Sequence, residues 1–64
     1  MTLEQALIKA GESTLPSEKI FVWDPIKKVM YKAEFWRLLD DPNYEEIRKQ
    51  EAVEIDWRIF YLLN

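Results

Sequence analysis

The chain of 64 residues contains no cysteine, no histidine and a single glycine. It therefore cannot form a disulfide, and it lacks the usual ligands of a structural zinc site. The same absences remove the thiol nucleophile and the side chain that most often transfers protons near neutral pH. One glycine is too few for a glycine-rich phosphate-binding loop. We therefore expect a protein that is not an enzyme and that holds neither a metal nor a cofactor.

Carboxylates are the remaining candidates for acid–base catalysis or cation binding. Four of them are close in sequence, namely Asp40, Asp41, Glu45 and Glu46. They lack the ordered spacing of a calcium-binding loop. A predicted helix end, a helix N-cap and a first helical turn account for them, because acidic groups are favoured at helix N-termini.

An excess of charge of one sign and a long apolar run are also missing. Twelve acidic and nine basic residues give a net charge of −3, which favours neither nucleic acid nor a membrane as a partner. No apolar run approaches the roughly 20 residues that cross a bilayer, and the first residues do not resemble a signal peptide. With the lack of cysteine, these features predict a cytoplasmic protein without membrane association.

Aromatic residues are abundant by contrast. There are nine of them, including three tryptophans, and all lie between Phe21 and Tyr61. We expect residues 1–64 to form one small domain, and domains of this size usually need additional stabilisation. Because disulfides and zinc are excluded, aromatic packing and self-association are the remaining sources of that stabilisation.

Helices are predicted in three places. Thr2 and Gln5 have the spacing of a capping box at the start of a first helix, and Gly11 stands where its C-terminal cap belongs. Residues 33–40 predict a second helix. Asp41, which precedes a proline, is the expected N-cap of a third.

Residues 19–32, KIFVWDPIKKVMYK, predict a β-hairpin that is apolar on both faces. Asp24 and Pro25 suit the first two positions of a type I turn. A turn closed by Asp24 and Lys27 places Trp23 opposite Lys28 and Lys19 opposite Lys32. Alternation then assigns Ile20, Val22, Val29 and Tyr31 to a core face. The second face carries Lys19, Phe21, Trp23, Lys28, Met30 and Lys32.

The C-terminal residues 52–63 fit two patterns. Alternating apolar residues from Val53 to Leu63 favour a strand, whereas the absence of glycine and proline after Ile47 favours a continuous helix. We favour the strand, because Glu54 and Asp56 beside the hairpin would relieve repulsion between Lys19 and Lys32.

The predicted fold is therefore α+β, a three-stranded antiparallel sheet in the order helix–strand–strand–helix–strand, with the helices packed on one face. The alternative is a β-hairpin followed by a mostly helical C-terminal half.

The second face of the hairpin is the candidate for function. Aromatic residues and methionine are enriched at the centres of protein interfaces. We expect an accessory or inhibitor subunit that docks on a protein partner or forms a homo-oligomer. The predicted partner-binding residues are Phe21, Trp23, Lys28, Met30, Lys32 and the neighbouring Trp36. The alternative is that this basic and aromatic face binds single-stranded nucleic acid. A third interpretation is that other elements cover the face.

Overall fold

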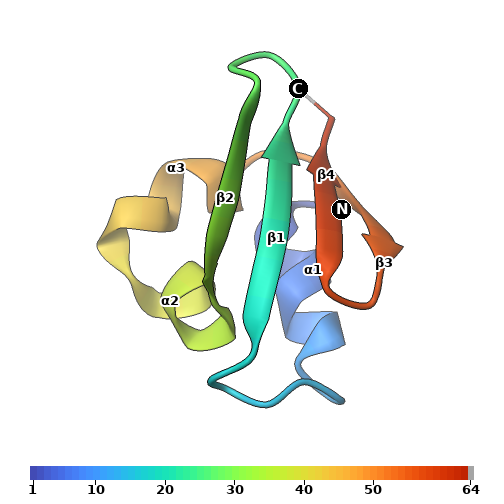
Figure 1. Ribbon diagram of the computed structural model, residues 1–64, viewed down its shortest axis with the longest axis vertical. Helices are drawn as coiled ribbons and strands as arrows, with labels where there is room; N and C mark the ends of the chain where they lie inside the picture. Colours follow the sequence, from blue (N-terminus) through green and yellow to red (C-terminus); the bar gives the residue numbers. More distant parts are fainter. Residues whose placement is uncertain (64) are drawn as a thin grey trace.

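The computed structural model of the protein describes residues 1–63 and contains helices and strands in one chain (Figure 1). The elements in chain order are α1 (Leu3–Ala10), β1 (Lys19–Asp24), β2 (Val29–Glu34), α2 (Phe35–Asp40), the 3₁₀ helix η1 (Pro42–Tyr44), α3 (Glu45–Arg48), β3 (Ala52–Asp56) and β4 (Ile59–Leu62).

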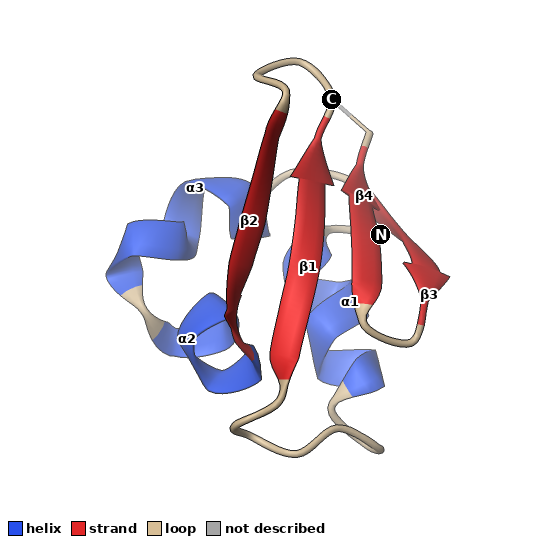
Figure 2. Ribbon diagram, in the orientation of Figure 1, coloured by secondary structure: helices blue, strands red, loops and turns tan. Residues whose placement is uncertain are grey.

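The four strands form one mixed sheet in the order β2-β1-β4-β3. The pairs β1–β2 and β3–β4 are antiparallel hairpins, and β1 and β4 run parallel at the centre. Helix α1 lies behind this sheet, and α2 and α3 lie beside the β2 edge, to the left in the view (Figure 2). The α+β class is confirmed. The prediction of three antiparallel strands is wrong, because the C-terminal segment supplies two strands and one of them pairs in parallel.

Helix α1 begins as its sequence predicts. The Thr2 hydroxyl accepts a hydrogen bond from the Gln5 N–H, and the Gln5 side chain accepts one from the Thr2 N–H. Gly11 is the C-cap with an ordinary right-handed backbone (φ −62°). A Cβ at this position would lie 2.8 Å from the ring of Phe35. Glycine is therefore needed here for close packing between α1 and α2.

The turn of the first hairpin is longer than predicted. Asp24 pairs with Val29, so four residues connect the strands. One carboxylate oxygen of Asp24 accepts hydrogen bonds from the N–H groups of Ile26 and Lys27, at 3.0 and 3.1 Å, and this holds the longer loop. The pairing differs by two residues from the predicted one. Because side chains alternate with a period of two, each strand residue keeps its predicted side of the sheet. Val29 is nevertheless 41% exposed, so its assignment to the core was wrong.

This shift corrects two predicted pairs. Lys28 lies in the turn with a φ of 56° and does not pair with Trp23, whose partner is Met30. Lys19 pairs with Glu34 and Lys32 with Phe21, so the two lysines do not stand opposite each other. Our reason for favouring a C-terminal strand was thus wrong, although the segment is extended and not helical.

The C-terminal segment turns at Trp57 and Arg58 and folds back as a second hairpin. No residue of this turn has a positive φ, and a bulge between Glu54 and Asp56 accompanies it. Two-residue turns without positive φ splay their strands, and the bulge compensates. Ala52, Phe60 and Leu62 thereby face the helices and are buried.

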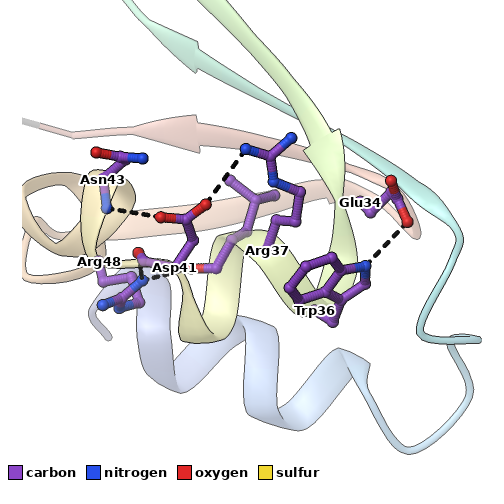
Figure 3. A network of polar contacts seen from close by, with 7 residues as sticks. Glu34, Trp36, Arg37, Asp41, Asn43 and Arg48 are labelled. Atoms are coloured by element: carbon purple, nitrogen blue, oxygen red, sulfur yellow. Dashed lines mark hydrogen bonds and ion pairs between the residues drawn. The ribbon is translucent and has the colours of Figure 1, made fainter.

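A polar junction joins α2 to α3 (Figure 3). Asp41 caps η1 by accepting a hydrogen bond from the Asn43 N–H (2.9 Å), as predicted for an N-cap. Arg48 donates to the carbonyl oxygens of Leu38 (3.0 Å) and Asp41 (2.8 Å). Helix α2 starts at Phe35 and not at residue 33, because β2 continues through Glu34.

The buried apolar residues form one cluster between the sheet and the helices. They come from every element except η1. The members are Leu3, Ala6, Leu7, Ile20, Val22, Ala33, Phe35, Leu38, Ile47, Ala52, Phe60 and Leu62. All strand members of this cluster project toward the helices, so the core uses only one side of the sheet.

Candidate docking surface

The other side of the sheet has no helix over it (Figure 1). We call this side the open face. Strand pairing brings its central side chains into two rows that cross all four strands. The first row contains Lys32, Phe21, Ile59 and Asp56. The second row contains Met30, Trp23, Tyr61 and Val53.

The second row is apolar from one edge of the sheet to the other. Met30 is 50% exposed, Val53 41% and Tyr61 36%. Trp23 lies between Met30 and Tyr61 and is partly buried. In the first row Ile59 is 39% exposed and Phe21 is partly buried. A monomer rarely leaves a contiguous apolar surface of this kind unused.

Charged groups stand at the two ends of the first row and in the neighbouring strand positions Lys19 and Glu34. The Lys32 ammonium lies 5.6 Å from the centre of the Phe21 ring, in a cation–π contact over β1. Asp56, at the opposite edge, pairs with Ile59 and accepts a hydrogen bond from the Trp57 N–H. Below this row, Lys19 and Glu34 are paired. The open face therefore carries both signs of charge around an apolar centre.

Four of the six predicted partner-binding residues come together on the open face: Phe21, Trp23, Met30 and Lys32. Lys28 does not join them, because the four-residue loop takes it out of β2. Trp36 does not join them either. It lies in α2, where its indole N–H donates to the Glu34 carboxylate at 2.9 Å (Figure 3).

Three further residues of the face were not predicted, namely Val53, Ile59 and Tyr61. Their alternation was visible in the sequence, but we assigned them with the apolar side of a single strand. Phe60 and Leu62 alternate with Ile59 and Tyr61 and are fully buried. This alternation distinguishes the core side of β4 from its open side. The second hairpin doubles the width of the surface that the first hairpin begins.

Trp36 instead lines a separate hollow between the end of α1 and α2. Its volume is about 220 Å³, which is below the roughly 300–1,000 Å³ of typical ligand pockets. Its lining residues are Gly11, Thr14, Pro16, Phe35, Trp36, Leu39 and Asp40.

Two of the four clustered carboxylates have structural partners. Asp41 caps η1 and forms an ion pair with Arg37 (3.3 Å). Glu45 forms one with Lys49 (3.6 Å). Among residues 1–63, no group of three or more acidic side chains converges as a metal site. No helix in the described part of the chain is long and apolar enough to cross a membrane.

Comparisons with protein-family models, with curated proteins and with solved structures find no significant match to this chain. The geometry of the open face is therefore the basis of the functional argument.

Proposed function

We propose that this chain is a non-enzymatic interaction protein that binds a protein partner through the open face. The observation that carries the proposal is the apolar row Met30–Trp23–Tyr61–Val53, which crosses the whole sheet and has no helix over it. An aromatic and methionine-containing centre with polar groups at its rim is the composition of interface cores.

The charge distribution supports a protein partner over a nucleic acid. A surface for single-stranded nucleic acid combines stacking aromatic rings with a positively charged groove along the backbone. On the open face, Lys19 stands opposite Glu34 in the strand register, and Asp56 ends the same row as Lys32. Lys28, which would have added to a basic stripe, lies in the turn. The face is therefore close to neutral.

Site-specific photo-crosslinking in the native cells tests this proposal. A photoreactive benzoylphenylalanine replaces Trp23 in one variant and Tyr61 in another. We expect both variants to give protein adducts upon irradiation, because both positions belong to the apolar row. Leu15 is the matched control, since it is apolar and 68% exposed but lies in the loop after α1. Adducts to nucleic acid, or equal protein adducts from position 15, would overturn the proposal.

A further inference from the structure

The open face has a pattern of charge that matches itself. Its first row begins with a cation, Lys32, on the edge strand β2 and ends with an anion, Asp56, on the other edge strand β3. Between them lie Phe21 and Ile59. The apolar row lies on one side of the first row, and the oppositely charged strand neighbours Lys19 and Glu34 lie on the other. A partner that complements this face needs an apolar centre, an anion opposite Lys32 and a cation opposite Asp56.

A second copy of the chain meets these requirements in one arrangement. In this arrangement two open faces pack against each other, and a two-fold axis runs between them parallel to the strands. Across the interface, the second copy then presents its strands in the reverse order. β2 then lies over β3 of the second copy, and β1 lies over its β4. Rows stay at the same height along the axis, so Lys32 of each copy faces Asp56 of the other. An axis across the strands instead places β2 over β2 and brings the two Lys32 side chains to the same edge.

We infer that the chain forms a two-fold homodimer in which two open faces pack together, with Lys32 of each copy paired with Asp56 of the other. This inference rests on the proposed function and names the partner of the same surface. The contact is isologous, because the same residues serve both copies. It joins the two sheets in the aligned packing of a β-sandwich, with a helical layer on each outer side.

The size of the face is close to what this contact requires. Four strands spaced about 4.8 Å apart and up to about 20 Å long make a footprint of about 400 Å², before the relief of the side chains is added. Two such footprints amount to about 800 Å² in total, and the relief of the side chains brings the buried area toward the roughly 1,000 Å² expected of a specific interface. The second row of each copy then supplies a continuous apolar seam with Trp23 and Tyr61 at its centre.

Pairing through sheet edges accounts less well for the surface. The edge at β3 is occupied at its beginning, because the Ala52 N–H donates to the Met1 carbonyl (2.9 Å) and Thr2 bridges to Glu51. The edge at β2 has no strand beside it in the described part of the chain. However, joining two β2 edges would leave the apolar row exposed in both copies.

Mixing two charge-reversed variants tests the arrangement. In K32D the dimer would hold two Asp–Asp contacts, and in D56K two Lys–Lys contacts. We expect each variant alone to dissociate at least about tenfold more readily than the parent in sedimentation equilibrium. An equimolar mixture restores both opposite-charge pairs, and we expect a heterodimer within about threefold of the parent affinity. Circular dichroism verifies that each variant is folded.

Reversals on the helical side provide matched controls. Lys49 and Glu45 form an exposed ion pair on α3, and we expect K49D and E45K to dimerise like the parent. A monomeric parent at millimolar concentration overturns the inference, as does a mixture of K32D and D56K that stays monomeric. Weakening by K32D but not by D56K indicates β2 edge pairing and also overturns it. If the parent is monomeric but the photo-crosslinks from position 23 reach another protein, the proposed function stands without this inference.

Discussion

At residue 28 the backbone takes a conformation that a lysine side chain disfavours. Its φ of 56° lies in the left-handed region, where a Cβ crowds the following carbonyl and glycine does not. The strain is tolerated because the Asp24 carboxylate holds the rest of the loop through two backbone N–H groups. The notable feature of Lys28 is therefore its backbone conformation in the turn, and its charge gave no indication of that conformation.

We predict that K28G raises the free energy of unfolding by about 0.5–1 kcal/mol, because glycine adopts positive φ without steric cost. Urea denaturation measures this change. K27G is the control, since Lys27 has no positive φ, and it should be less stable than the parent. Equal effects of the two substitutions would contradict the account of the turn. Self-association should be unchanged in K28G, because residue 28 is outside the open face.

Gly11 is a second residue whose structural role could not be inferred from its neighbours in the sequence. Its position as a helix C-cap was predicted correctly, but the reason glycine stands there was not. The Phe35 ring, 24 residues further along the chain, occupies the place of a side chain. Contacts between residues so distant in sequence have no local signature, whereas the capping box of Thr2 and Gln5 is local and was confirmed.

At the scale of elements, the junction between α2 and α3 depends on one carboxylate. The hydrogen bond from the Asn43 N–H lowers the pKa of Asp41 below its ordinary value of 3.8. Partial burial raises this pKa, and the neighbouring Arg37 lowers it further, so that the net shift is downward. Because the folded state binds the proton less readily than the unfolded state, ionised Asp41 stabilises the fold.

This contribution is present above pH 3.8 and is lost as the pH falls from there through the lowered pKa of the folded state. We predict that the difference in unfolding free energy between the parent and D41N is largest at neutral pH and shrinks toward pH 3. Urea titrations at several pH values measure the unfolding free energy of both proteins. Because the parent and D41N share all other carboxylates, subtracting the two values cancels the contributions of those groups. A gap that stays constant with pH would show that the Asp41 charge is not involved.

Elements with local signals were predicted well, and their assembly was not. The first hairpin and the N-cap at Asp41 each follow from a few adjacent residues. The turn at Trp57 and Arg58 contains none of the usual turn residues, so we joined two strands into one. Phe60 consequently had no assigned place, although it is fully buried. The parallel pairing of β1 with β4 joins segments 38 residues apart, from Phe21 to Ile59, and no sequence pattern indicated it.

For the whole molecule, the main feature is a sheet whose two sides are both apolar while only one is covered. The first hairpin predicted half of the open face through Phe21, Trp23, Met30 and Lys32. The other half required the position of β4 between β1 and β3. A small chain without disulfides or zinc gains stability when a second copy covers this side, because binding to the folded state alone shifts the unfolding equilibrium.

The double variant F21S/W23S separates an open surface from a second core. Its two serines remove apolar area from the open face and weaken strand propensity, which costs about 1 kcal/mol for each residue. I8S/L15S is the control, because Ile8 and Leu15 are exposed apolar residues outside the sheet. F60A removes a fully buried ring and should cost about 3–5 kcal/mol, enough to unfold a marginally stable domain.

The most direct test is the urea midpoint of unfolding at micromolar and at submillimolar protein concentration. The parent and I8S/L15S should show midpoints that rise with concentration, since the dimer is favoured by mass action. F21S/W23S should unfold cooperatively, with a midpoint that is independent of concentration. That midpoint should lie below the midpoint of the dilute parent by no more than the roughly 2 kcal/mol of lost strand propensity explains. A variant that unfolds like F60A would place Phe21 and Trp23 in a core, and a midpoint that still rises would show that association does not use the open face.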